Sequence, residues 1–140
     1  MKKLLLLTVC ALLLAAGTQA GAQSPPSTTC TGSLKPAIEL NLYFGRDIEA
    51  GGEVSEAQWA EFMAAEVTPR FPDGLSVLNV VGQSRNSKNQ TLRERTKLLI
   101  VVVFDAPAHQ ARVDAIVQSY KKRFGQDGVF RTEKAVCAGV

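Results

Sequence analysis

Residues 98–104 read LLIVVVF, and this unbroken apolar, β-branched run decides the fold. Successive side chains of a strand point to opposite faces, so an uninterrupted apolar run is typical of a strand that is buried on both faces. Residues 83–96, just before it, are polar and without periodicity, which predicts a long hairpin loop. The run therefore predicts a strand in the middle of a sheet.

Three more strands are predicted around this run. Residues 38–44 alternate apolar and polar side chains, which is typical of a strand with one buried face. Residues 75–81 follow a Pro-Asp-Gly turn and predict the next strand. Residues 129–136 alternate with charges, which suits an edge strand that avoids pairing with other chains.

Two helices are predicted between the strands. Ser55 and Gln58 form a capping box, and apolar residues recur at helical spacing from Trp59 to Val67. A second apolar stripe with helical spacing lies within residues 113–124 and is followed by a glycine that ends the helix.

The order of these elements is strand, helix, strand, strand, helix, strand, which is the ferredoxin-like pattern. Right-handed crossovers place the third strand between the first and the second, and the fourth strand outside the first. We therefore expect an α+β domain with a ferredoxin-like βαββαβ fold. Its four-stranded antiparallel sheet would have the order 4-1-3-2, with two helices on one face.

The start of the chain has the features of an exported protein. Residues 1–22 combine a basic start, an apolar run of about 13 residues and small residues at their end, and are interpreted as a signal peptide cleaved after Ala22. The run is shorter than the roughly 18 to 20 residues that span a bilayer, so we expect no stable membrane insertion after cleavage. Residues 23–34 predict a flexible leader, and residues 35–140 a single periplasmic or secreted domain.

The charge balance argues against one class of partner. The chain has 16 Lys and Arg against 13 Asp and Glu, and Lys2 and Lys3 fall within the predicted signal peptide. The mature domain is then nearly neutral, and a nearly neutral domain does not attract polyanions. We therefore expect no nucleic-acid partner.

Two cysteines, Cys30 and Cys137, remain after the predicted cleavage. An even pair of cysteines in an exported protein is typical of a disulfide. In the predicted sheet the start of the first strand lies beside the end of the fourth, where these two residues fall. The alternative, a reactive or metal-binding thiol pair, lacks CxxC spacing and histidine partners.

Several short strings resemble one bacterial family. They are LYFG at residues 42–45, VSE at 54–56, VTPRFPDGL at 67–75, RE at 93–94 and YKKRFGQ at 120–126. With these motifs the chain resembles the domain of unknown function 3574 family, whose members are small exported proteins without an assigned activity. The resemblance covers nearly the whole mature chain. It implies domain boundaries and export, but no particular chemistry.

The central strands are more apolar than one helix-covered face requires, so we expect something to cover the second sheet face. A second copy of the chain or a small apolar ligand would do so. Glu39, Asn41 and Tyr43 would point to this face, where Glu39 is either a carboxyl of raised pKa able to act as acid or base, or a rim residue in water. Tyr43 is either a donor beside it or a packing residue.

Arg46, Arg70, Arg93 and Glu94 are further candidates, since they lie near the ends of predicted strands and helices. Arginine binds carboxylates and phosphates through its forked guanidinium, which suits an anionic ligand. In the structural alternative, Arg70 pairs with Asp73 and Arg93 with a nearby acid to fasten turns.

No catalytic group, cofactor or metal site is predicted. His109 is the only histidine and is expected to be exposed, and no His, Cys or Asp cluster has ligand spacing. We therefore favour a non-enzymatic binding or interaction domain that dimerises through the open sheet face. The alternatives are a cofactor-independent enzyme acting on a small organic molecule, by analogy with dimeric α/β-barrel enzymes, and a protease-inhibitor or chaperone-like module.

Overall fold

Four antiparallel strands form one sheet in the order β2-β3-β1-β4. The computed structural model describes residues 29–48 and 50–139, so the predicted signal peptide and residues 23–28 of the predicted leader lie outside the described residues. The elements are β1 (Lys35–Gly45), α1 (Glu56–Phe62), β2 (Ser76–Arg85), β3 (Thr91–Val103), α2 (His109–Phe124) and β4 (Phe130–Ala138). The predicted α+β class and the strand order 4-1-3-2, read here from the other edge, are confirmed.

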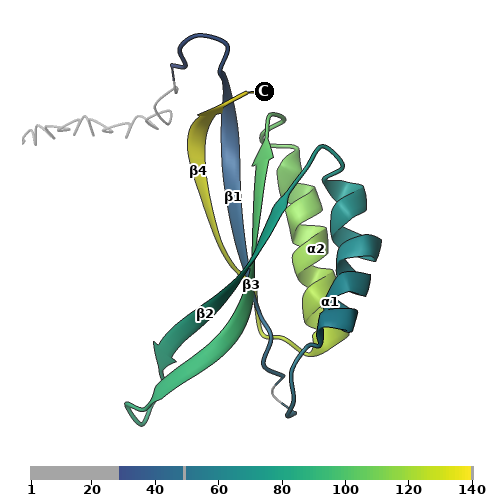
Figure 1. Ribbon diagram of the computed structural model, residues 1–140, viewed down its shortest axis with the longest axis vertical. Helices are drawn as coiled ribbons and strands as arrows, with labels where there is room; N and C mark the ends of the chain where they lie inside the picture. Colours follow the sequence, from purple (N-terminus) through teal and green to yellow (C-terminus); the bar gives the residue numbers. More distant parts are fainter. Residues whose placement is uncertain (1–28, 49, 140) are drawn as a thin grey trace, which may run out of the picture.

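Both helices pack on the same face of the sheet, as Figure 1 shows. β1 explains why, because Leu40, Leu42 and Phe44 are fully buried and alternate with residues of the other face. The core lies between this face and the helices, where the rings of Phe44, Phe62 and Tyr120 meet edge to face. The opposite face of the sheet carries no helix in the described part of the chain.

α1 begins where the capping box predicts. The hydroxyl of Ser55 accepts a hydrogen bond from the backbone N–H of Gln58, and the side-chain oxygen of Gln58 accepts one from the N–H of Ser55. The helical turns do not end with α1, since a π-helical turn (Met63–Val67) and a 3-10 turn (Thr68–Arg70) follow it.

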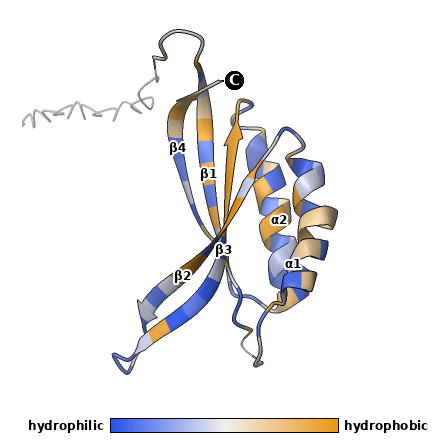
Figure 2. Ribbon diagram, viewed as in Figure 1, coloured by the Kyte–Doolittle hydropathy of each residue, from blue (hydrophilic) through white to orange (hydrophobic). Residues whose placement is uncertain are grey.

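The predicted loop over residues 83–96 is wrong. β2 continues to Arg85 and β3 begins at Thr91, so the connection is short and most of this segment is paired strand. The segment reads as a loop because the far half of the hairpin extends beyond the helices and therefore needs no apolar face (Figure 1). Figure 2 shows this change along β3, which is hydrophilic in the hairpin and hydrophobic beside the helices.

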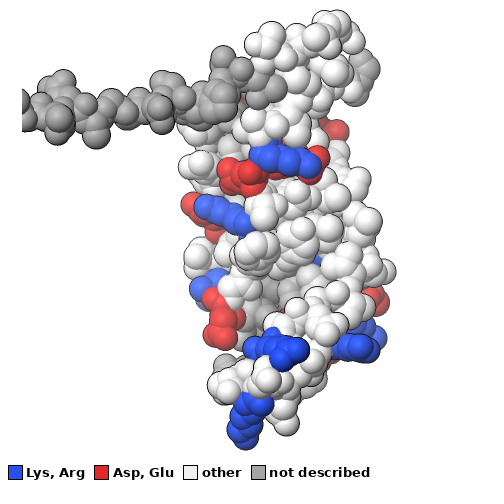
Figure 3. Space-filling view, turned by 90° about the vertical axis from the view of Figure 1, so that its left-hand side faces the viewer, with Lys and Arg blue, Asp and Glu red and all other residues white. Residues whose placement is uncertain are grey.

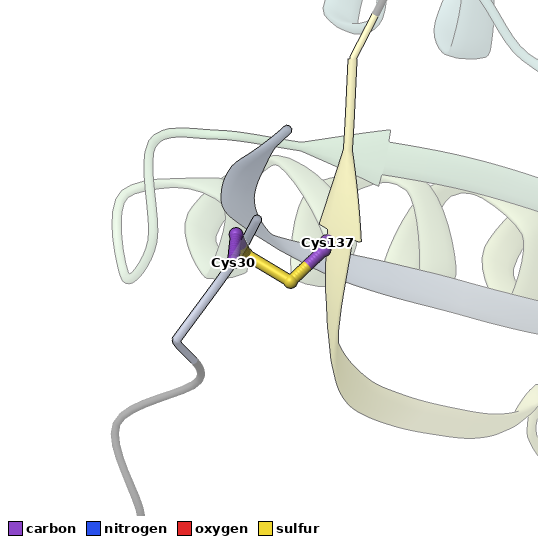
Figure 4. Close-up of a disulfide and its surroundings, with 2 residues drawn as sticks. All are labelled: Cys30 and Cys137. Carbon is purple, nitrogen blue, oxygen red and sulfur yellow. A yellow bond between two sulfur atoms is a disulfide. The ribbon is translucent and has the colours of Figure 1, made fainter. Parts of the chain in front are cut away.

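The disulfide between Cys30 and Cys137 is present, with the two Cα atoms 5.6 Å apart (Figure 4). It joins the segment before β1 to the end of β4, where Pro36 pairs with Cys137. The bond therefore holds the first and last strands of the sheet together across 107 residues of sequence. Among the described residues, no helix is long and apolar enough to cross a membrane.

Candidate functional site

The sheet face away from the helices, called here the open face, is largely apolar. Tyr43 of β1 pairs with Leu98 of β3, which pairs with Leu78 of β2, so the three strands place these side chains in one row. Leu78 and Val102 stay 45% and 39% exposed. In Figure 3, which views the molecule from this side, charged side chains form separate groups around broad uncharged areas.

The apolar residues on this face come from all four strands, and each is exposed or partly exposed. The side chains that define it are Tyr43, Leu78, Leu98, Ile100, Val102 and Phe130. Phe130 of β4 is 69% exposed, and its ring centroid is 5.5 Å from that of Tyr43. Exposed apolar patches of this kind mark interaction surfaces.

Glu39 and Asn41 also lie on the open face, but Glu39 does not have the raised pKa considered from the sequence. Lys134 of the neighbouring strand contacts the Glu39 carboxylate at 3.0 Å, and Asn41 donates a hydrogen bond to it. These two contacts lower the pKa of Glu39 below its ordinary value of 4.5, with the lysine contributing most. The sequence did not predict this because Lys134 is 95 positions away and comes beside Glu39 only through strand pairing.

A cavity of about 460 Å³ opens at the end of the open face, and we call it the strand-end cavity. Its walls come from the end of β1, the start of β3 and the segment between α2 and β4. Its lining includes Tyr43, Asp47, Glu94, Thr96, Asp127 and Phe130. The structure therefore brings together two of the predicted candidates, Tyr43 and Glu94.

Glu94 is held across the end of β1. Its carboxylate accepts a hydrogen bond from the backbone N–H of Asp47 at 3.2 Å and lies against Gly45, where it leaves no room for a Cβ atom. The carbonyl of Gly45 accepts a hydrogen bond from the hydroxyl of Tyr120 at 2.8 Å. Burial raises the pKa of Tyr120 above its ordinary value of 10.0, so this hydroxyl remains a donor.

Arg46 is buried rather than available to a ligand. Its guanidinium donates to the carbonyl of Val54 and to Glu56, and forms an ion pair with Glu53. Lys97, also buried, contacts the same Glu56 at 2.7 Å. This cluster fastens the start of α1 to the sheet on the helix-covered side, so its first role is structural.

The other two candidate arginines, Arg70 and Arg93, do not belong to the ion-pair cluster of Arg46. Arg70 pairs with Glu66 in the preceding helical turn, and not with Asp73 as the sequence had suggested. It lines a second cavity, of about 710 Å³, at the far end of the sheet. Arg93 lies in β3 within the hairpin, is exposed, and forms no ion pair with a described residue.

His109 is not exposed, contrary to the sequence prediction. Its side chain is 2% exposed at the start of α2, and its Nε2 atom lies 3.6 Å from a carboxylate oxygen of Glu133. Position 109 lies four residues before Val113 and so continues the apolar stripe of the helix by one turn, a spacing that could have predicted its burial. Among the described residues, no group of three or more His, Cys, Asp or Glu side chains is placed to hold a metal.

The fold and its face define a class: a small α+β domain with helices on one side of an antiparallel sheet and an uncovered apolar surface on the other. The chain belongs to the family described as "Protein of unknown function (DUF3574)", whose model matches residues 39–139. No curated protein matches its sequence.

Solved structures are similar in fold at low identity. A phage SAM lyase in complex with S-methyl-5'-thioadenosine aligns with a TM-score of 0.54 and 12% identity, covering 81% of this chain and 97% of the lyase. The apo state of a phage SAM lyase aligns with a TM-score of 0.55 and 10% identity over 81% and 92% of the two chains. CutA1 from Oryza sativa aligns with a TM-score of 0.46 and 11% identity over 78% and 87%.

Proposed function

We propose that this protein is a periplasmic or secreted binding domain of ferredoxin-like topology that associates with a second copy of itself through the open face. The observation that carries the proposal is the apolar open face, on which Leu78, Val102 and Phe130 are each more than a third exposed. A sheet face left to water normally alternates apolar side chains inward with polar ones outward. Here both sides of β3 are apolar, which favours a face that is covered in the functional protein.

The size of the face fits a second copy. Four strands about 4.8 Å apart and 11 residues long, as β1 is, span about 700 Å². A stable interface of standard size buries about 800 Å² on each partner. A two-fold contact over the whole open face therefore buries about 700 Å² on each partner, which lies within the roughly 600–1,000 Å² per partner of standard-size interfaces.

The charges on the face also favour a copy over a charged partner. Glu39 and Lys134 form an ion pair with each other on the open face. The apolar row from Tyr43 to Leu78 is uncharged and lies four residues along β1 from Glu39. This central row can thus pack against a second copy without bringing unpaired like charges together.

The disulfide supports the proposed location. A bond between Cys30 and Cys137 is maintained in oxidising compartments and is rare in the cytosol. The predicted signal peptide, residues 1–22, agrees with export. Both features are expected of a domain that works in the periplasm or outside the cell.

A catalytic role has weaker support. The enzyme alternative used Glu39 as a proton donor or acceptor near neutral pH, and the lowered pKa of Glu39 makes it a poor acid there. The phage SAM lyases share 12% identity or less with this chain, so their likeness extends to the fold alone.

A matched pair of substitutions on β2 tests the proposal. Leu78→Glu places a charge on the open face, whereas Val81→Glu, three positions along the strand, places one on the opposite side. Val81 is the more exposed of the two, at 68% against 45%, so general effects on solubility are controlled. Sedimentation velocity should show that Leu78→Glu is monomeric and Val81→Glu dimeric. Equal masses for both variants and the wild type would contradict the proposal.

A further inference from the structure

The last residues of β3 have no neighbouring strand on the side of β2. β2 begins at Ser76, which pairs with Ile100, whereas β3 continues to Val103. On its other side β3 stays paired with β1 as far as Val103. The end of β3 is therefore a free strand edge, although the rest of β3 lies inside the sheet. A free edge is a template on which a further extended chain can pair.

The backbone of Val102 directs its hydrogen-bonding groups out of this edge. The N–H of Arg46, just after β1, donates to the carbonyl of Arg95, so the carbonyl of Arg95 is turned towards β1. These directions alternate along an antiparallel strand, and the pairing of β3 with β1 is uninterrupted from Thr96 to Val103. Val102 lies an odd number of residues from Arg95. Its N–H and C=O therefore point away from β1, towards the free edge.

The free edge lines the cavity of about 710 Å³ that also contains Arg70, called here the sheet-edge cavity. The wall opposite the edge comes from the turn before β2. The buried ring of Phe71 belongs to this wall, and the Cζ atom of Arg112 lies 5.3 Å from the ring centroid. Both terminal nitrogens of Arg112 donate to Asp105, at 2.7 and 2.9 Å. The charge of Arg112 is therefore already balanced within the wall.

Arg70 and Asp73 supply available charges of opposite sign. Only Nη1 of Arg70 is occupied, by the carboxylate and the carbonyl of Glu66, so Nε and Nη2 bond to no described residue. These two nitrogens form one side of the guanidinium fork, which matches the two oxygens of a carboxylate. Asp73 is exposed and forms no ion pair with a described residue. Its carboxylate is therefore available to an ammonium group.

We propose that the sheet-edge cavity binds a short peptide with free ends, in extended form, as an added strand beside β3. One peptide residue exchanges two hydrogen bonds with the backbone of Val102. The peptide carboxylate binds Arg70, and its ammonium group binds Asp73. Arg70 and Asp73 are three residues apart, so their Cα atoms are separated by at most about 10 Å, which is also about the span of an extended tripeptide.

The charges of the cavity favour a peptide with two charged ends over a simple anion. Two arginines and two aspartates line it: Arg70, Arg112, Asp73 and Asp105. A zwitterion leaves this balance unchanged, whereas an anion or a cation alone meets like charges. An added strand lies in the plane of the sheet, so the peptide does not cover the open face. The site is contained in one chain and does not rest on the proposed dimer.

Titration of the purified protein with the tripeptide Ala-Leu-Ala, followed by amide NMR shifts, tests the site. Ala-Leu-Ala should give saturable shifts at the amides of Val102 and Gly74, which line the cavity. The same tripeptide with an acetylated amino end and an amidated carboxyl end has lost both charges and should bind at least about five-fold more weakly. Ala-Pro-Ala keeps both charges but lacks the central N–H, and should also bind several-fold more weakly.

Variants identify the charged groups. Arg70→Lys keeps the positive charge and removes the fork, and Asp73→Asn removes the negative charge. Each should weaken Ala-Leu-Ala binding by about two- to five-fold, the range of a partly exposed charge contact. The matched controls are Arg93→Lys and Asp127→Asn, which change an arginine and an aspartate outside this cavity and should leave the affinity unchanged. The amide spectrum of each variant shows whether it is folded.

Three results would overturn the proposal: no binding of Ala-Leu-Ala at millimolar concentration, equal binding of the blocked tripeptide, or equal affinities for Arg70→Lys and Arg93→Lys. The Leu78→Glu variant separates this proposal from the previous one. Binding that persists in a monomeric Leu78→Glu protein supports a site within one chain, and loss of binding in that folded monomer would contradict it. A wild-type protein that is monomeric yet binds the tripeptide would refute the dimer and support this site.

Discussion

The carboxylate of Glu94 on β3 occupies the space that a side chain at Gly45 on β1 would need. The backbone of Gly45 does not itself need a glycine, since it lies in a regular strand and pairs with Thr96. A Cβ atom at position 45 would displace the Glu94 carboxylate from the place that it occupies. This contact fixes the position of Glu94 at the mouth of the strand-end cavity.

Gly45→Ala should therefore destabilise the protein by about 1 kcal/mol, because the Glu94 carboxylate must swing away and lose the hydrogen bond from the Asp47 N–H. Gly82→Ala is the control, because a Cβ there meets its nearest atom, the Thr96 hydroxyl, at an ordinary contact distance of 3.5 Å. Urea unfolding of both variants measures the difference. Equal midpoints for the two variants would show that Glu94 moves aside without cost.

The buried lysine on β3 gives a second prediction. Glu56 accepts hydrogen bonds from the Lys97 ammonium, which lowers its pKa below the ordinary 4.5. Glu56→Gln leaves Lys97 charged, buried and bonded mainly to Asn79, at a cost of about 1–3 kcal/mol for the unsatisfied ammonium group.

The control for this change is Glu61→Gln on the same helix. Glu61 is as exposed as Glu56, at 68% against 67%, but its partner Arg123 is on the surface. Thermal unfolding should show a clear loss for Glu56→Gln and almost none for Glu61→Gln. The lowered pKa stabilises the fold fully above about pH 4.5 and progressively less below it, so the difference between wild type and Glu56→Gln should shrink as the pH falls below 4.5.

Cys30→Ser should lower the stability by up to about 4–5 kcal/mol, because the disulfide closes a loop of 107 residues in the unfolded chain. The fold should remain, since Cys30 precedes β1 and takes no part in the core. Calorimetry of the variant and of the reduced wild type should give the same loss. Titratable thiols in the unreduced protein without residues 1–22, which contain Cys10, would contradict the bond.

Tyr120 predicts how the protein responds to alkali. Burial raises its pKa above 10.0 in the folded state, so above pH 10 the unfolded chain loses this proton more readily than the folded protein. The free energy of unfolding should therefore fall as the pH rises past 10. Tyr120→Phe should remove this fall and cost about 1 kcal/mol at neutral pH for the lost hydrogen bond to Gly45. A pH dependence that is unchanged in the variant would show that another group is responsible.

The sequence predicts this fold well where apolar and polar side chains alternate along a strand or where a side chain caps a helix. Ser55 and Gln58, three positions apart at the start of a helical pattern, predict a capping box, and this capping box is present. The disulfide follows from the predicted strand order, because Cys30 and Cys137 come together only if β4 lies beside β1. These features depend on local residue patterns and on the order of the elements, and both can be read from the sequence.

The site is less predictable, because its properties depend on neighbours distant in sequence. Tyr43 and Glu94 were candidates, but Asp47 and Asp127 were not, since each lies in a polar turn where an acid is ordinary. Neither acid forms an ion pair with a described residue, and no Lys, Arg or His lines the cavity beside them, which no linear pattern shows. The hairpin over residues 83–96 was missed for a related reason: its strands face water on both sides and so lack apolar alternation.

The central claim, that the open face is an interface between two copies, is tested most directly by the solution mass of the wild-type protein. Light scattering across a dilution series should give twice the chain mass over the upper part of the range, with dissociation only on strong dilution. A mass equal to one chain at every concentration would contradict the account and leave the face formed by Tyr43, Leu78, Leu98, Ile100, Val102 and Phe130 without the partner proposed for it.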